Sequence, residues 1–175
     1  ANGDKYVGEW KDGLYHNQGV FTWATGGEYL GGYRYGSYHG QGTFTYADDT
    51  KMAEGEFKEN KLNGHGLRWF PNGSLLEQGM YKNNKMHGKG TVYYEDGSIK
   101  VVGNFKNGKK DGYAIWYNGY GGIYKEGIFK DGKFMNAYKK SGLDKHKEVC
   151  EEIGFKPKTE GFGNCVLRLM ELNKY

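Results

Sequence analysis

A glycine followed two residues later by an aromatic side chain recurs six times along this 175-residue chain, at intervals of 23 or 24 residues. The pairs are Gly8-Trp10, Gly31-Tyr33, Gly55-Phe57, Gly79-Tyr81, Gly103-Phe105 and Gly127-Phe129. Self-similarity at a fixed period of this size indicates a repeat architecture, in which each unit packs on its neighbours. Positions within each unit are counted below from this anchor glycine, which is position 0.

Two turn patterns recur in each unit. Positions +4 and +5 form pairs such as Asp12-Gly13, Asn107-Gly108 and Asp131-Gly132, which tolerate positive φ at both residues and predict a two-residue type I′ hairpin. A glycine or aspartate at +18 supplies a second reversal. The chain is therefore expected to be mainly β: an elongated, single-layer antiparallel meander of about six hairpins over residues 1–138.

Counting outward from the hairpin turn places +2 opposite +7, the anchor glycine opposite +9, and −2 opposite +11. Period-two alternation then puts the glycines at 0, +9 and +11 on one face, together with the aromatic rings. The composition of 31 glycines with 16 Tyr, 9 Phe and 4 Trp fits a layer in which rings cover glycines. We therefore expect a Gly→Val change at Gly64 or Gly88 to displace a ring.

The glycine period stops after Met135, and helical patterning begins. We expect a short helix over residues 143–153 and a second one beginning after Thr159, both within a C-terminal segment of residues 139–175. An amphipathic helical pair would cap the exposed edge and ring face of the last hairpin. The residues expected to make this contact are Val149, Ile153, Phe155, Phe162, Val166 and Leu169.

The pattern G-x-W/F/Y-K-x-G/N-x-x-x-G-x-G, with a period near 23, resembles the MORN (membrane occupation and recognition nexus) repeat. The resemblance implies one hairpin per repeat and a non-enzymatic platform for protein interaction or dimerisation, with a role at phospholipid membranes also attributed to the family. The last unit departs from the pattern, because Tyr138 stands at +11 where the family has glycine.

Residues 150–165 are similar to a Cys-containing tail of bacterial envelope and secreted proteins, although Lys158 stands where that tail usually has glycine. The similarity gives a weak preference for a bacterial envelope or secreted protein over a cytoplasmic one. Cys150 and Cys165 form a disulfide if the compartment is oxidising, and are otherwise two buried thiols.

Catalytic and cofactor motifs are missing from the sequence, which has no Walker A motif, no dinucleotide-binding loop and no nucleophile elbow. His16, His39 and His87 share position +8, but equivalent residues lie two strands apart, roughly 9.6 Å. One zinc ion needs ligands about 2.1 Å away, so these histidines cannot share a metal. We expect no enzyme activity, no cofactor and no metal.

The leading functional hypothesis is an interaction scaffold that binds a protein partner, or a second copy of itself, through its aromatic and glycine face. Large aromatic side chains dominate the energetics of interfaces. The candidate binding residues are Trp10, Tyr33, Phe57, Tyr81, Phe105 and Phe129, together with Trp23, Tyr46 and Tyr94. A carbohydrate-binding role has only the rings in its favour.

The alternative hypothesis concerns a basic residue at +3 of every unit, beside the hairpin turn. These residues are Lys11, Arg34, Lys58, Lys82, Lys106 and Lys130. Such a row would bind anionic lipid headgroups or acidic envelope polymers at a membrane surface. The plainer interpretation is that the lysines keep exposed turns soluble. Nucleic acid is not expected as a partner, because the formal net charge is only +4.

Overall fold

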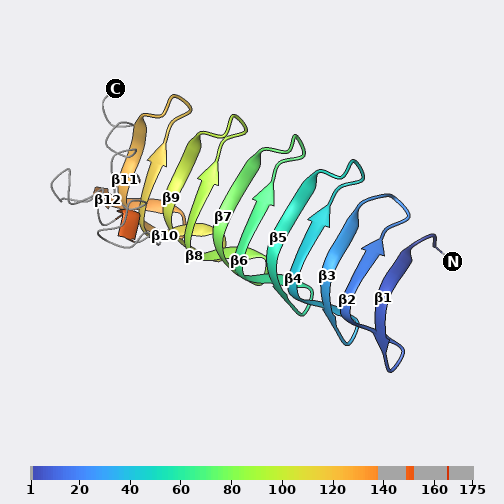
Figure 1. Ribbon diagram of the computed structural model, residues 1–175. Helices are drawn as coiled ribbons and strands as arrows, with labels where there is room; N and C mark the ends of the chain where they lie inside the picture. The colour runs from blue at the N-terminus through green and yellow to red at the C-terminus, as the bar shows by residue number, and fades with distance from the viewer. Residues whose placement is uncertain (1, 138–148, 152–164, 166–175) are drawn as a thin grey trace. The chain divides into compact units, whose positions relative to one another are not determined.

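The computed structural model describes residues 2–137, 149–151 and 165, which form twelve strands and a short helical segment (Figure 1). The chain divides into two compact units, Ala1–Lys85 and Met86–Tyr175, and each is described by itself. In both units the strands follow one another in sequence order as an antiparallel meander. The predicted mainly β, single-layer array of hairpins is confirmed.

The N-terminal unit contains β1 (Lys5–Lys11), β2 (Leu14–Thr22), β3 (Glu28–Arg34), β4 (Ser37–Thr45), β5 (Lys51–Lys58), β6 (Lys61–Trp69) and β7 (Leu75–Lys82). The C-terminal unit contains β8 (Lys85–Tyr93), β9 (Ile99–Lys106), β10 (Lys109–Tyr117), β11 (Ile123–Lys130) and β12 (Lys133–Ala137). Residues 149–151 and Cys165 are helical, and the remainder of the two predicted helices lies outside the described residues.

The six hairpin turns have the predicted type I′ conformation, with positive φ at both central residues. Even the pair Glu59 and Asn60 takes φ values of 51° and 64°. The second turn of each unit also follows the prediction. Its +18 residue has positive φ, and Asp49, for example, donates its N–H to the Tyr46 carbonyl at 3.1 Å.

The predicted register is correct only for the pairs next to the turn. A two-residue β-bulge interrupts the first three hairpins and the fifth, and a one-residue bulge interrupts the sixth. Gly8 pairs with Gly19 at +11, not with Asn17 at +9. The +9 residue lies in the bulge with positive φ, 52° at Asn17 and 81° at Gly64. A side chain added at Gly64 would first meet Glu56 and not a ring, so this glycine is present for its backbone conformation.

The glycines at 0 and +11 do provide packing space for side chains on the same face, called here the ring face. The Tyr29 ring lies over Gly42, and the Tyr6 ring lies over Gly19. Tyr6 also stacks on Tyr15 with ring centroids 3.8 Å apart, so the rings form a continuous layer. Rings covering glycines are thus the core of the N-terminal unit, as the composition predicts.

Each hairpin turn is bonded to the hairpin before it. The N–H at +5 donates to the +7 carbonyl of the preceding unit, as in Gly36 to Tyr15 (2.9 Å) and Gly108 to Met86 (2.8 Å). Where +5 is asparagine, its side chain adds a second bond: Asn84 Oδ1 accepts the Leu62 N–H at 2.7 Å. The turns are therefore held at fixed intervals along each unit.

The C-terminal segment packs on the face opposite the ring face, and not on the edge and ring face that we expected it to cap. Val149 and Cys150 are buried with Val102, Tyr113, Ile115 and Tyr117 of β9 and β10, and Ile123 and Ile128 of β11, in the last hairpin, pack against this cluster. Most of the last strand, β12, remains exposed. The reason is that this opposite face, polar at His65 and Lys89, becomes apolar at Tyr113, the same +10 position. Ile153, Phe155, Phe162, Val166 and Leu169 lie outside the described residues.

The Gly42→Ala substitution tests the covering of glycines by rings. A Cβ atom at Gly42 would lie 2.5 Å from Cζ of Tyr29, and φ at Gly42 is not positive, so the effect is steric. We expect the free energy of unfolding to fall by about 1–3 kcal/mol in urea denaturation followed by circular dichroism. The control is Gly119→Ala, where a Cβ has no neighbour within 4 Å. Equal effects of the two substitutions would contradict this packing role.

Removing residues 141–175 should expose Val102, Ile115 and Tyr117, which are at most 2% exposed in the full chain. We expect the truncated chain to aggregate in light-scattering measurements, because a contiguous apolar patch is uncovered. The control truncation carries Val102→Gln and Ile115→Thr, the residues at the same positions in the preceding hairpin (Gln78 and Thr91). Its aggregation to the same extent would contradict the covering role.

Candidate interaction surface

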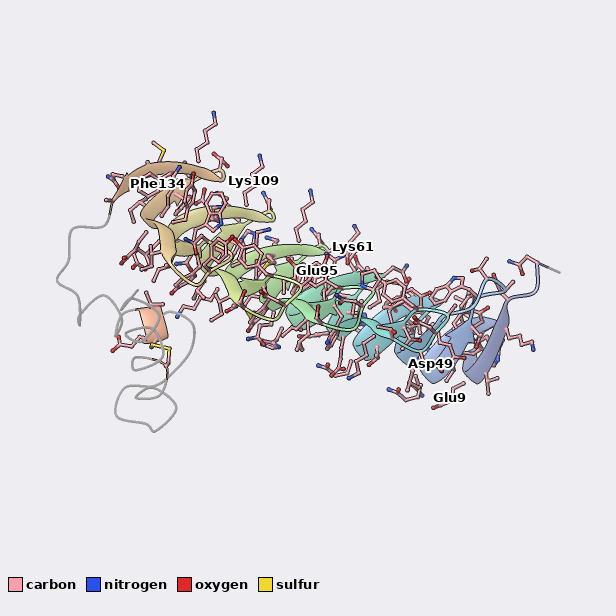
Figure 2. The ribbon with its side chains drawn as sticks, turned by 90° about the horizontal axis from the view of Figure 1, so that it is seen from above. Glu9, Asp49, Lys61, Glu95, Lys109 and Phe134 are labelled. Carbon is pink, nitrogen blue, oxygen red and sulfur yellow. A yellow bond between two sulfur atoms is a disulfide. The ribbon has the colours of Figure 1, made fainter. Side chains whose placement is uncertain are left out.

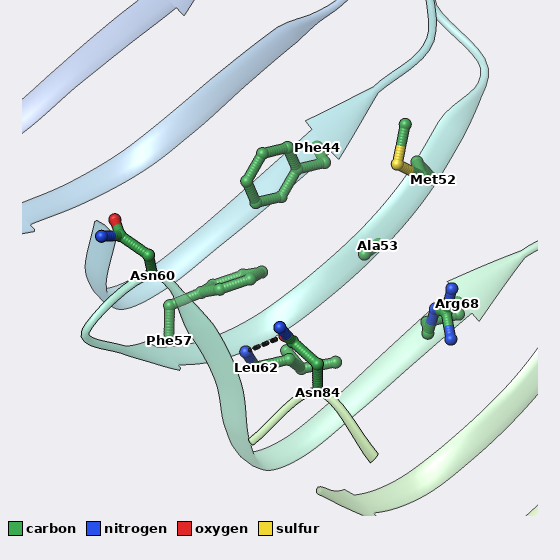
Figure 3. Close-up of a pocket in the computed structure, with 8 residues that line it drawn as sticks. All are labelled: Phe44, Met52, Ala53, Phe57, Asn60, Leu62, Arg68 and Asn84. Atoms are coloured by element: carbon green, nitrogen blue, oxygen red, sulfur yellow. Dashed lines mark hydrogen bonds between the residues drawn. The ribbon is translucent and has the colours of Figure 1, made fainter. Parts of the chain in front are cut away.

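The ring face of the N-terminal unit is hollowed over β4, β5 and β6. This hollow has a volume of about 330 Å³ (Figure 3). Its floor and walls are mainly apolar, with asparagine and arginine side chains at its rim. The lining residues are Phe44, Met52, Ala53, Phe57, Asn60, Leu62, Arg68 and Asn84.

The hollow exists because the column at position −2, meaning the set of equivalent residues in successive units, loses its ring from the third unit onward. Position −2 is tyrosine in the first two units, Tyr6 and Tyr29, and alanine in the third, Ala53. Ala53 lies between Phe44 and Arg68 in the sheet register, so its small side chain leaves a gap between them. Leu62 takes over the covering of Gly66.

Polar groups at the rim of the hollow are held in place by hydrogen bonds. Asn84 Oδ1 accepts the Leu62 N–H, as Figure 3 shows, and Asn60 Nδ2 donates to Ser37 Oγ at 3.2 Å. Arg68 Nη1 lies 3.2 Å from Glu77 Oε1. The rim therefore presents preorganised donors beside an apolar floor.

Glu77 also anchors a buried tyrosine. Tyr81 donates its hydroxyl to Glu77 Oε1 at 3.0 Å. Burial, followed by the charge of Glu77, raises the pKa of Tyr81 far above its ordinary value, so the phenol stays neutral. Glu77 is thereby shared between Tyr81 and Arg68, which fixes one wall of the hollow.

A second hollow, of about 430 Å³, adjoins the first on the same face. Phe44 and Met52 line both hollows, so the two form one continuous depression across the ring face. Trp23 and Tyr46 line the second hollow, beside the turn that contains Gly26 and Gly27. Trp23, Phe44, Tyr46 and Met52 are half-buried, and partly accessible aromatic and methionine side chains are typical of adaptable protein-binding surfaces.

The structure divides the predicted aromatic binding residues into two groups. Tyr33, Phe57, Tyr81, Phe105 and Phe129 are at most 7% exposed and form the core, although Phe57 also lines the first hollow. Trp10 is 58% exposed, and Trp23, Tyr46 and Tyr94 are half-buried. The surface available to a partner is therefore smaller than the predicted set.

The predicted basic row is exposed at every turn. Of its members, Lys130 forms an ion pair with Asp111 (3.0 Å), whereas Lys11, Arg34, Lys58, Lys82 and Lys106 have no ion-pair partner among the described residues. A second basic residue stands at +6 in most units, for example Lys61, and Asp49 lies at the opposite end of the strands (Figure 2). Each turn thus presents unpaired positive charge.

Cys150 and Cys165 form a disulfide with a Cα–Cα distance of 5.9 Å, which resolves the alternative left open by the sequence.

His16, His39 and His87 stand at position +8, and the third unit has Asn63 at this position. Asn63 has a structural role, because its Oδ1 accepts the N–H of Asn83 at 3.2 Å. Among the residues described, no three His, Cys, Asp or Glu side chains gather as a metal site. No helix in the described part of the chain is long and apolar enough to cross a bilayer.

Sequence reasoning missed Met52, Ala53, Leu62 and Arg68 as surface residues of the hollow. Three of them occupy positions that carry a ring in the first two units: −2 (Ala53), +7 (Leu62) and +13 (Arg68). The change from Tyr6 and Tyr29 to Ala53 within one column was the available indication. The gap is therefore indicated by the column that changes between units, and not by the repeated pattern.

Comparison with protein families identifies the repeat. A sequence profile of the MORN repeat matches residues 6–28, 29–51, 54–75, 78–99 and 102–119. These five matches cover more than half of the chain, and the sixth hairpin, β11 and β12, lies beyond them. Comparison with curated proteins gives no match.

Proposed function

The chain belongs to the MORN repeat family, whose repeats serve as non-enzymatic scaffolds for protein or membrane interaction, and we propose that it binds a protein partner through the hollowed ring face of its N-terminal unit. The observation that carries this proposal is the continuous depression lined by Trp23, Phe44, Tyr46 and Met52. The partner is another protein or a second copy of this chain.

The depression has the composition of a protein-binding surface. Its centre is aromatic and aliphatic, so covering it removes apolar area from water, at about 25 cal/mol per Å². Its rim carries Asn60, Asn84 and Arg68, whose polar groups would orient the backbone of a bound segment. The floor residues Phe57 and Leu62 are already buried, so they are held rigid before binding.

The Ala53→Leu substitution should fill the first hollow and block binding. We expect partner proteins captured from the source cells on the immobilised chain, and identified by mass spectrometry, to fall about tenfold, equivalent to ~1.4 kcal/mol. The matched control is Thr43→Leu, which adds an apolar side chain to the opposite face of β4. Equal capture by all three folded proteins would contradict the proposal.

A second candidate function, binding to an anionic surface, is favoured by the unpaired lysines and arginine at the hairpin turns. Within each unit, successive turns are separated by two strands, about 9.6 Å, so an anionic surface meets several charges at once. Each contributes about 1 kcal/mol near an anionic membrane. The unpaired residues are Lys11, Arg34, Lys58, Lys82 and Lys106, whereas Lys130 pairs with Asp111.

Flotation with vesicles containing phosphatidylserine tests this second function. We expect binding at low ionic strength, and its loss at high ionic strength because salt screens exposed charges. Replacing Lys11, Arg34, Lys58 and Lys82 by glutamine should reduce the bound fraction several-fold. Binding that persists unchanged in high salt, or that never occurs, would leave the row as a solvated edge.

A further inference from the structure

Three lysines on the ring face of the C-terminal unit stand where the preceding repeat has an apolar residue: Lys100 follows Leu76, Lys110 follows Met86 and Lys125 follows Val101. Lys110 stands at +7, which is Tyr15, Tyr38, Leu62, Met86 and Phe134 in the other units. Lys125 stands at −2, which is Tyr6, Tyr29, Ala53, Glu77 and Val101 in the other units. Lys100 lies in the bulge between Val101 and Ile99, where Met52 lies in the β4–β5 pair. Three positions thus change from apolar to positively charged side chains within one small area.

The ammonium groups of these lysines lie over aromatic rings. Lys110 Nζ is 4.2 Å from the centroid of Trp116 and 5.2 Å from that of Phe129. Lys100 Nζ is 5.1 Å from the Tyr94 centroid, and Lys125 Nζ is 5.2 Å from that of Tyr124. Cation–π contacts of this kind hold the charges in fixed positions on the sheet.

The three positive charges are not compensated within the described residues. None of the three lysines forms an ion pair there, whereas on the N-terminal unit Arg68 pairs with Glu77. Burial, followed by the charges of Lys100 and Lys125, lowers the pKa of Lys110. The lysines therefore repel one another, and an anion placed among them would relieve this repulsion.

We infer that this lysine and aromatic patch binds an acidic peptide segment, with carboxylates at Lys100, Lys110 and Lys125 and an apolar side chain against Trp116 and Tyr124. The inference rests on the proposed role in protein interaction and assigns the partner's chemistry. Tyr124 is 57% exposed and offers apolar area beside the charges. These lysines lie along the face of the sheet, and a flexible peptide reaches them there, whereas a bilayer would first meet the lysines at the turns.

Fluorescence anisotropy with the full chain and a labelled Glu-Glu-Phe-Glu-Glu peptide tests the inference. We expect this peptide to bind more tightly than the matched Gln-Gln-Phe-Gln-Gln peptide. The triple substitution Lys100→Gln, Lys110→Gln and Lys125→Gln should weaken binding at least tenfold. The control, Lys106→Gln, Lys109→Gln and Lys133→Gln, removes the same charge from exposed turns of the same unit and should change binding less than twofold.

Equal losses in the two triple variants would overturn the inference, because they would indicate attraction by net charge alone. A wild-type chain that binds the two peptides equally well would also overturn it. So would a chain that binds phosphatidylserine vesicles through these three lysines but does not bind the peptide. If the triple variant does not fold, Lys110→Met, which carries the residue found at Met86, is expected to weaken binding several-fold. The Ala53→Leu chain should bind the peptide normally, so failure here is distinguishable from failure of the N-terminal site.

Discussion

The bond from each hairpin turn to the preceding hairpin determines where the other residues of the array lie. The N–H at +5 reaches back to the +7 carbonyl in every pair of successive units, at 2.8–3.2 Å. A type I′ turn points this N–H outward from its own hairpin, so positive φ at two residues is needed for the contact. Because the turns are fixed, the rings and the basic residues beside each turn recur at regular positions. The position of the hollow at Ala53 follows from the same spacing.

Much of this fold could be predicted from local chemistry. The turn pairs, the two strands per unit and the ring-covered glycines all follow from residues adjacent in sequence or one unit apart. The bulge could not be predicted from the alternation of residues, because a glycine such as Gly64 is equally consistent with packing space and with positive φ. Asn17 in the same column was the better indication, since asparagine provides no packing space but tolerates φ of 52°.

The candidate sites depend on departures from the repeat, and these are harder to predict. Ala53 marks a hollow only because Phe44 and Arg68 flank it in the corrected register. The contact of Val149 with Val102 and Ile115 likewise depends on the face opposite the rings becoming apolar in one unit. The repeat pattern predicts the scaffold, whereas function resides in the residues that differ between units.

The meander also has a consequence for how the chain folds. Every strand pair described within each unit joins strands that are neighbours in sequence, so no long loop must close before hydrogen bonds form. Sheets usually fold slowly because their pairings are non-local, whereas low contact order speeds folding. Nucleation can begin at any of the hairpins and spread in both directions. The contact of residues 149–150 with β9 and β10 is the longest-range event and would come last.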